Sequence, residues 1–251
     1  MMKYCFLIFL FLMISFSVFA RPEIDSLFHA LDEVIERKHE FEKDKKDEIE
    51  NLSNQLRTVK TGSMEERFSV TEQLHQAYFT FNYDSALLYS RQLLEIANRS
   101  GQKDMIARAQ LRMNETLLAS GLFAVVKDSL EKISLPDLSD SLRAKYHYMN
   151  ARLYIDMSNY YQRPFYSEKF GQLVTAHLDS AVYWARKESR IWYSLRGLRF
   201  IWRLEYQEAK KFFMICSPIL KWEAGNMLLM LLLLLSFFDS WGNRKRSWSG
   251  C

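Results

Sequence analysis

Residues 193–216, which read YSLRGLRFIWRLEYQEAKKFFMIC, decide the fold. Bulky side chains alternate with small ones across two helical segments that divide at Leu204-Glu205. Two helices pack closely only where one side of the contact is small, and Gly197 and Ala209 meet that need. The positions that we expect to pack this hairpin are Tyr193, Gly197, Phe200, Tyr206, Ala209 and Phe213. The stretch therefore predicts an antiparallel pair of helices that ends near Cys216.

The same pattern occurs earlier in the chain, where Tyr83-Asp84-Ser85-Ala86 matches Tyr206-Gln207-Glu208-Ala209. A capping box at Ser63 and Glu66 begins a helix over residues 64–81, which we expect to pack against residues 83–100. Tyr83 and Ala86 are the expected packing positions of this hairpin. A second hairpin is predicted from residues 105–120 and 123–133, and a third opens at residues 137–140. We predict an all-α, right-handed solenoid of helical hairpins over residues 63–217.

The spacing of these hairpins predicts an irregular array. If Ala86, Val126, Ala181 and Ala209 are equivalent small positions, they lie 40, 55 and 28 residues apart. A regular array of this kind repeats about every 34 residues. The solenoid is therefore expected to be degenerate.

The longest expected irregularity is residues 159–171, NYYQRPFYSEKFG, which Pro164 interrupts. An insertion of this length inside a hairpin is often functional, or it packs on its neighbours. Tyr161 and Tyr166 are its candidate peptide-binding residues. The alternative is that its aromatic rings pack on the adjacent helices.

The N-terminal region predicts export. Residues 1–20 combine a basic start, an apolar run and small side chains before a signal-peptide cleavage site after Ala20. An uncleaved anchor is the alternative. Residues 21–60 are then a charged amphipathic segment, either one long helix or two joined near Asp44. Lys38 and Lys45 break its apolar stripe, so a homodimeric coiled coil through residues 23–59 competes with a helix that caps the repeats or lies alone.

Composition excludes several classes of protein. Of 251 residues, 49% are hydrophobic, and the 8 glycines and 4 prolines are too few for an all-β chain rich in turns. The net charge of +4 gives no reason to expect nucleic acid as a partner. The three cysteines show no metal or disulfide spacing.

No catalytic, metal-binding or cofactor-binding motif is present, so we expect a protein that is not an enzyme and needs no cofactor. The clearest binding candidates are Arg196, Arg199 and Arg203, which recur three and four residues apart on one predicted helix. Such a stripe can meet an acidic peptide or a carboxylate terminus. A solvated helix face is the alternative.

The tail, residues 218–251, has a different character. Residues 227–238 form an apolar run, but a membrane span needs about 20 residues. They are a weak candidate for a transmembrane helix, and a buried helix is the alternative.

Several segments together resemble tetratricopeptide (TPR) repeats and, beyond them, a family of exported regulators typical of the Bacteroidetes. They are IDSLFHALDEVIERK, NYDSALLYSRQLLEIA, LLASGLF, AKYHYMNARLYIDMSNY, HLDSAVYWA and LRGLRFIWRLEYQEAKKFF. The resemblance implies further repeats, a transmembrane helix and a cytoplasmic coiled-coil or DNA-binding region, as in a one-chain sensor. This chain departs from that pattern after Cys216, so a truncated or frame-shifted product without a DNA-binding output is expected.

These features lead to an exported scaffold on the periplasmic side that binds protein or peptide in the concave groove of its repeats. The first alternative is a membrane-tethered sensor and transcriptional regulator with residues 227–238 as its span. The second is a homodimer through residues 23–59.

Overall fold

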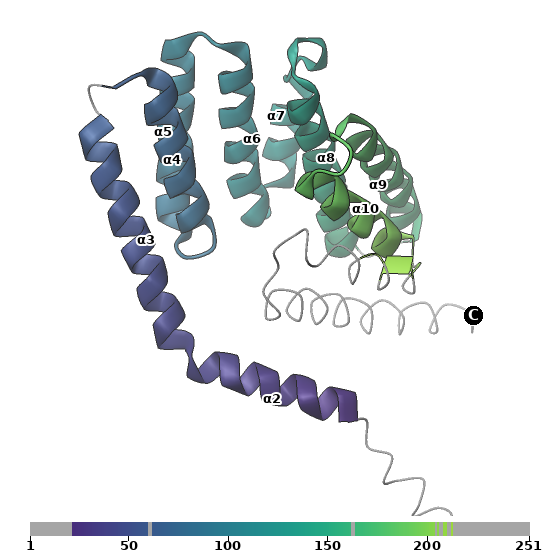
Figure 1. Ribbon diagram of the computed structural model, residues 1–251. Helices are drawn as coiled ribbons and strands as arrows, with labels where there is room; N and C mark the ends of the chain where they lie inside the picture. Colours follow the sequence, from purple (N-terminus) through teal and green to yellow (C-terminus); the bar gives the residue numbers. More distant parts are fainter. Residues whose placement is uncertain are drawn as a thin grey trace, which may run out of the picture. The chain divides into compact units, whose positions relative to one another are not determined.

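The computed structural model describes residues 22–59, 62–161 and 164–203, together with Glu205, Glu208, Ala209 and Phe212. All regular secondary structure in these described residues is helical, which confirms the all-α prediction (Figure 1). The elements are α2 (Pro22–Glu36), α3 (Lys38–Thr58), α4 (Met64–Phe79), α5 (Tyr83–Ser100), α6 (Lys103–Ala119), α7 (Phe123–Glu131), a short 3-10 turn (Leu135–Asp137), α8 (Asp140–Tyr161), α9 (Pro164–Trp184) and α10 (Arg190–Trp202).

The chain divides into two compact units, residues 1–43 with 222–251 and residues 44–221. In the first unit, α2 ends at Glu36 and α3 begins at Lys38. Two helices are therefore present in the N-terminal segment, and they join at Arg37 rather than near Asp44. Arg37 donates to the carboxylate of Glu40 at 2.9 Å across this join.

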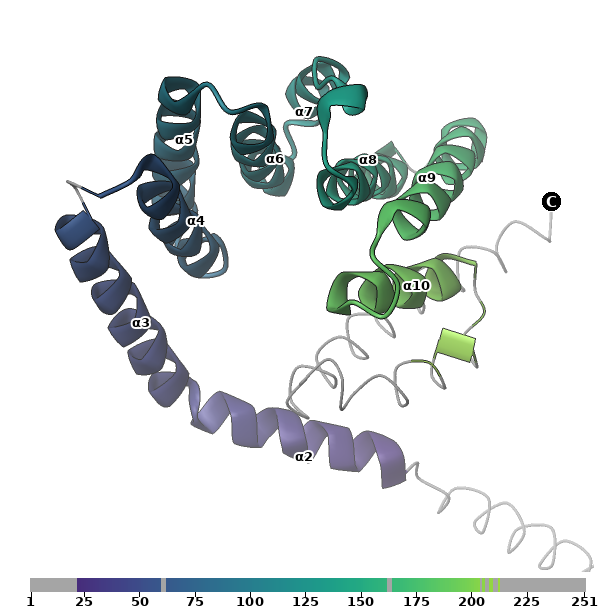
Figure 2. The same cartoon turned by 45° about the horizontal axis from the view of Figure 1, so that its top comes forward.

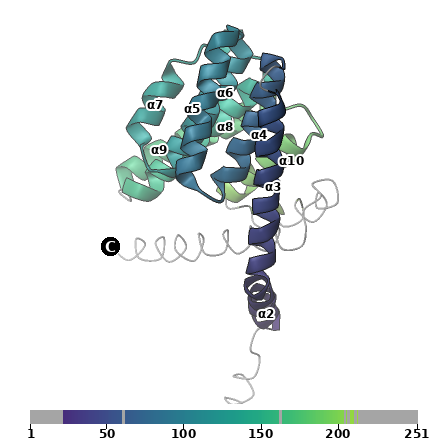
Figure 3. The same ribbon diagram turned by 90° about the vertical axis from the view of Figure 1, so that its left-hand side faces the viewer.

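In the second unit, the helices form a curved array of antiparallel hairpins (Figure 2). Helices α4, α6, α8 and α10 follow the inner side of the curve, and α5, α7 and α9 follow the outer side. From the side, α7 and α9 lie opposite α4 and α10 (Figure 3). Consecutive helices contact each other, and α6 also contacts α8 directly. The inner helices α4, α6, α8 and α10 thus each pack against at least one outer helix.

The hairpins are more regular than the sequence suggested. The outer helices begin at Tyr83, Phe123 and Pro164, which are 40 and 41 residues apart. The prediction of separations of 40, 55 and 28 was wrong because Ala181 lies near the end of α9, whereas Ala86 and Val126 lie near the starts of their helices.

The prediction of an insertion at residues 159–171 was also wrong. Helix α8 continues to Tyr161 and α9 begins at Pro164, so only residues 162–163 separate them. Proline is well suited to the first position of a helix, where a backbone N–H has no partner within the helix. Pro164 therefore begins a helix instead of interrupting one.

Local signals set the first hairpin. The Ser63 hydroxyl accepts a hydrogen bond from the backbone N–H of Glu66 at 3.1 Å, as the capping box predicts. The Asn82 side chain does the same for Ser85 at 2.9 Å and begins α5. Gly101 ends α5 with a φ of 68°, a left-handed conformation that glycine adopts without strain.

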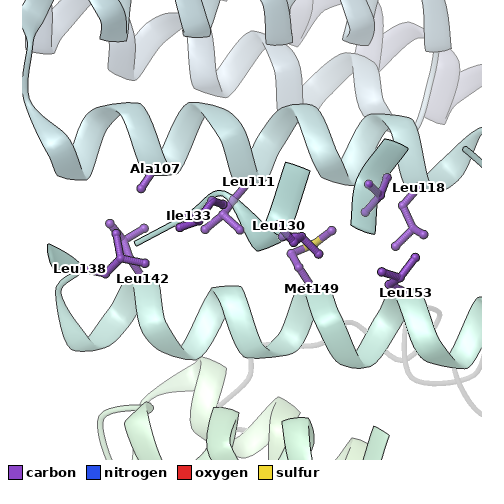
Figure 4. Close-up of a cluster of buried hydrophobic side chains, with 10 residues drawn as sticks. Ala107, Leu111, Leu118, Leu130, Ile133, Leu138, Leu142, Met149 and Leu153 are labelled. Carbon is purple, nitrogen blue, oxygen red and sulfur yellow. The ribbon is translucent and has the colours of Figure 1, made fainter. Parts of the chain in front are cut away.

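The largest core cluster joins α6, α7 and α8. Figure 4 shows their apolar side chains pointing toward one another between the helices. The cluster consists of Ala107, Leu111, Leu118, Val126, Leu130, Ile133, Leu138, Leu142, Met149 and Leu153. It ties the second hairpin to the third.

The expected packing residues fall into three groups. Ala86, Gly197 and Ala209 are buried. Tyr193 and Phe200 contact Phe212, with ring centroids 5.8 and 5.6 Å apart, whereas Tyr83 is 39% exposed. Tyr206 and Phe213 lie outside the described residues.

The predicted cleavage site after Ala20, the tail of residues 218–251 and the run 227–238 also lie outside the described residues. Among the helices that the structure does describe, none is both long enough and apolar enough to span a membrane.

The core cluster leads to a stability prediction. Leu153 is fully buried, and its truncation in Leu153→Ala leaves a cavity between α6, α7 and α8. We expect a loss of about 2–5 kcal/mol in the free energy of unfolding, measured by urea denaturation. Leu88→Ala is the control, because Leu88 is 53% exposed, and it should cost much less. Equal losses would contradict this account of the core.

Candidate functional site

The inner face of α8 is the part of that helix that the core leaves unused. Leu142, Met149 and Leu153 pack in the cluster with α6 and α7, and Ala144 and Ala151 pack in clusters with residues of α9 and α10. The remaining face carries side chains three or four residues apart, which therefore lie on one side of the helix. They are Lys145, Arg152 and Asp156, with Tyr148 between them at the edge of this face, where it packs against two of the clusters.

Charged side chains on α4 and α6 extend this face across three inner helices. Arg108 and Arg112 of α6 form ion pairs with Glu72 of α4, and the charges of these residues act on Lys145 of α8. We call the set the inner charged row, and it consists of Glu72, Arg108, Arg112, Glu115, Lys145, Arg152 and Asp156.

Glu72 is the centre of the row. Its carboxylate accepts hydrogen bonds from Arg108 and from Nε of Arg112, the latter at 2.9 Å. Arg112 Nη1 donates to Glu115 at 2.9 Å, so one guanidinium joins two carboxylates. Burial raises the pKa of Glu72, but the charges of Arg112 and Arg108 lower it by more, and the net pKa falls below its usual value. The pairs connect α4 to α6, and the side chain of Glu72 is only 15% exposed.

Lys145 faces this network from α8 without a partner. Within the described part of the chain, its ammonium has no ion pair or hydrogen bond. Burial and, next, the charge of Arg112 lower the pKa of Lys145 to about 8. Lys145 is therefore a half-buried cation that no carboxylate of the row neutralises directly.

Arg152 and Asp156 complete the row on α8. Arg152 Nη2 lies 3.8 Å from Asp156, and Nη1 lies 3.4 Å from the Tyr148 hydroxyl. Burial raises the pKa of Asp156 above its usual value, although Arg152 acts in the opposite direction. The Arg152 side chain stays 46% exposed, so it can also contact a partner.

His75 lies close to the charged row but does not share its charge. It is fully buried, and its Nε2 lies 2.8 Å from the Thr116 hydroxyl. Burial and, next, the charge of Arg112 lower the pKa of His75 to about 4, so the ring is neutral at pH 7. It therefore connects α4 to α6 without adding to the positive charge.

A second polar contact joins α8 to α9. Nδ1 of His147 lies 3.1 Å from Nδ1 of His177, so one of the two nitrogens carries the shared hydrogen. The ring of Tyr154 stacks on His177 with centroids 5.7 Å apart. Burial lowers the pKa of both histidines, and the nearby His147 helps to lower that of His177 to about 4.

These histidines do not belong to a larger ligand set. Among the described residues, no group of three or more histidine, cysteine, aspartate or glutamate side chains could hold a metal ion.

The basic stripe expected on residues 196–203 is divided between two environments. Arg199 and Arg203 both contact Asp179 of α9, at 3.1 and 3.2 Å. Arg196 instead lies over the rings of Trp192 at 4.6 Å and Phe212 at 5.4 Å. The three arginines therefore do not act as one free basic surface, and their role in binding stays a prediction.

Tyr161 and Tyr166 lie at the tip of the α8–α9 hairpin. Their ring centroids are 5.9 Å apart, and both contact the buried Phe170. They are 45% and 47% exposed. Both rings therefore pack on Phe170 and are also partly exposed to solvent. These contacts do not test whether the two tyrosines bind a peptide, so that role stays a prediction.

Sequence reasoning missed the inner charged row. The spacing of Arg108, Arg112 and Glu115 was visible, as was that of Lys145 and Arg152. The sequence did not show that these side chains lie close together in space. Their proximity depends on how α6 and α8 align, with α7 and two turns between them.

The network around Glu72 predicts a loss of stability when its charge is removed. Glu72→Gln leaves Arg108 and Arg112 without their shared carboxylate, and we expect a cost of about 1–3 kcal/mol in urea denaturation. Glu50→Gln on the exposed face of α3 is the control and should change little. A Glu72→Gln variant as stable as the parent would show that the pairs do not hold α4 to α6.

The histidine pair predicts a pH dependence. The pKa of His177 falls from 6.5 to about 4 on folding, so between these values the unfolded chain binds more protons than the folded one. The contribution of His177 to stability is complete above pH 6.5 and is lost as the pH falls toward 4. His177→Gln should therefore reduce the dependence of the unfolding free energy on pH in this window. His39→Gln, which changes an exposed histidine, is the control; an unchanged slope in His177→Gln would contradict the assignment.

Comparison with known proteins identifies the family. Residues 35–229 match the family model of the SusR N-terminal TPR domain, a TPR-type regulator family of the Bacteroidetes. No curated protein and no solved structure matches the chain. The match covers most of the chain, including every hairpin described above, and it confirms the resemblance drawn from the repeats. The chain belongs to the SusR N-terminal TPR domain family.

Proposed function

We propose that this protein is an exported, non-enzymatic scaffold that binds a protein or peptide along the inner charged row. TPR domains are in general protein-interaction scaffolds, and the family match extends this general role to the chain. An array of hairpins offers its inner helices to an extended ligand, because the outer helices cover their other side.

The single observation that carries the proposal is the inner charged row itself. Its seven charged side chains come from three helices and occupy a face that the core does not use. Lys145 has no partner in the described chain, and Arg108 and Arg152 are 43% and 46% exposed. Charged groups of this kind give specificity and orientation to a bound partner.

The regulator family and the predicted signal peptide of residues 1–20 support a sensory role. We propose that the scaffold faces the periplasm and is the extracytoplasmic sensory part of a regulator. The tether through residues 227–238 and the homodimer through residues 23–59 stay predictions.

Peptide selection tests the proposal. A random peptide library is displayed on phage and selected on the full chain, and the selected peptides are synthesised for calorimetric titration. We expect Arg152→Glu to weaken their binding by about tenfold or more, because it reverses a charge at the contact. Arg91→Glu changes an exposed arginine on the outer helix α5 and should leave binding unchanged. Failure to select any peptide, or equal effects of the two variants, would contradict binding along the inner charged row.

A further inference from the structure

The connections between the helices alternate between two edges of the array. In Figure 1 the α4–α5 turn is at the lower end of its helices and the α5–α6 turn is at the upper end. Because consecutive helices are antiparallel, the α6–α7 and α8–α9 turns lie at the same edge as the α4–α5 turn. At this edge the ring centroids of Phe123 and Tyr160 are 5.7 Å apart, so the second and third hairpin tips contact each other.

Charged side chains are scarce at this edge. No aspartate, glutamate, lysine or arginine occurs in four stretches that end there, although such residues make up 25% of the chain. The stretches are residues 79–83, 117–126, 157–161 and 164–167. Charges resume at Asp84 and Glu168, and Arg163 lies outside the described residues.

Large exposed hydrophobic side chains take the place of charges at these three tips. Tyr160 and Phe165 are 71% and 72% exposed. We call the set the uncharged edge, and it consists of Phe81, Tyr83, Leu122, Val125, Tyr160, Tyr161, Phe165 and Tyr166.

The opposite edge of the array is charged. Lys103 lies 3.1 Å from Asp137 there, and both side chains are exposed. Further exposed charged residues at this edge are Glu65, Glu66, Asp104, Asp140, Arg186, Lys187 and Glu188. The exposed apolar side chains Met64, Tyr183 and Ile191 also lie toward this edge, but among those charges. The hairpin array is therefore amphipathic from one edge to the other.

Half of the uncharged edge is tyrosine. Within the described part of the chain, the hydroxyls of these four tyrosines make no hydrogen bond. Tyrosine is enriched where a membrane meets water, because its ring is apolar and its hydroxyl can bond to lipid headgroups. Phenylalanine, leucine and valine side chains beside it suit the boundary between headgroups and acyl chains.

We propose that the uncharged edge docks on the surface of a lipid bilayer, with the three hairpin tips in the headgroup region. Tips that stand in a row can meet one flat surface together, whereas a protein partner needs a matching relief. The edge also lacks the charged groups that pair with the polar rim of a protein partner. The periplasm, in which we place the chain, is bounded by membranes. This surface shares no residue with the inner charged row, so either proposal can fail without the other.

A dye that brightens in apolar surroundings tests the contact on the full chain. Val125→Cys places a nitrobenzoxadiazole label on the second tip, and Lys103→Cys places it on the opposite edge as a control. Serine replaces the three native cysteines in both proteins. Each protein is titrated with vesicles of phosphatidylcholine alone and with vesicles that also contain anionic phosphatidylglycerol. Vesicle binding through residues 1–20 or 227–238 alone does not brighten position 125, because the dye reports only its own surroundings.

We expect the label at position 125 to brighten equally with both kinds of vesicle and the label at position 103 to stay unchanged. Tyr160→Ser with Phe165→Ser removes two rings of the third tip and should weaken the binding read at position 125 by about tenfold or more. Both side chains are mostly exposed, so the midpoint of urea unfolding should stay near that of the parent. Tyr183→Ser with Ile191→Ser removes two exposed apolar side chains from the charged edge and should leave binding unchanged.

Four outcomes overturn the inference. The first is no brightening at position 125, and the second is equal brightening at positions 125 and 103. The third is brightening only with phosphatidylglycerol, which assigns the contact to charge. The fourth is a label at position 125 that is bright before vesicles are added, in a chain that light scattering shows to be a dimer. In that case a second copy covers the edge.

Discussion

The ion pairs around Glu72 impose the constraint on which the inner face depends. Arg112 is largely buried, and its guanidinium needs both Glu72 and Glu115 to replace the water it has lost. This requirement fixes the position of α6 against α4, since the two carboxylates come from different helices. The charges of this network also act on Lys145 of α8, and burial and Arg112 together lower its pKa. The same network that joins the first two hairpins thus leaves the third with an unmatched cation.

Burial of the apolar core offsets the free-energy cost of burying these charged side chains. The cluster between α6, α7 and α8 connects the second hairpin to the third. A smaller cluster connects α4 and α5 to α6, and two others connect α8 to α9 and α10, as in other repeat proteins, where each unit contacts only its neighbours. The 18 residues of α5 with the 17 of α6 in one repeat, and the 22 residues of α8 in the next, explain why the repeat is about 40 residues and not the 34 of the regular form. The added turns lengthen the inner face and give room for a row of charges.

Much of the fold could be predicted from local signals. Ser63 with Glu66 and the glycine at position 101 mark helix ends, so the first hairpin was predicted almost to the residue. Pro164 misled the prediction because proline ends some helices and begins others, and one sequence does not show which. Ala181 misled it for a similar reason, since a small residue near the end of a long helix resembles one near the start of a short helix.

The candidate site depended on contacts between helices. Asp179 of the preceding helix forms ion pairs with Arg199 and Arg203, and Glu72 of α4 forms ion pairs with Arg108 and Arg112 of α6. The spacing of residues along one helix does not show which residues of another helix form ion pairs with them.

Direct titration of the Lys145 ammonium by NMR tests whether the inner face holds an unmatched positive charge there. Side-chain resonances of the lysines are assigned in the full chain by comparison with Lys145→Arg, and each is followed from pH 6 to 11. The pKa of Lys145 is expected to be about 8, far below the ordinary 10.5, because the ammonium is buried beside Arg112. A pKa near 10.5 would contradict the burial of Lys145 beside this network.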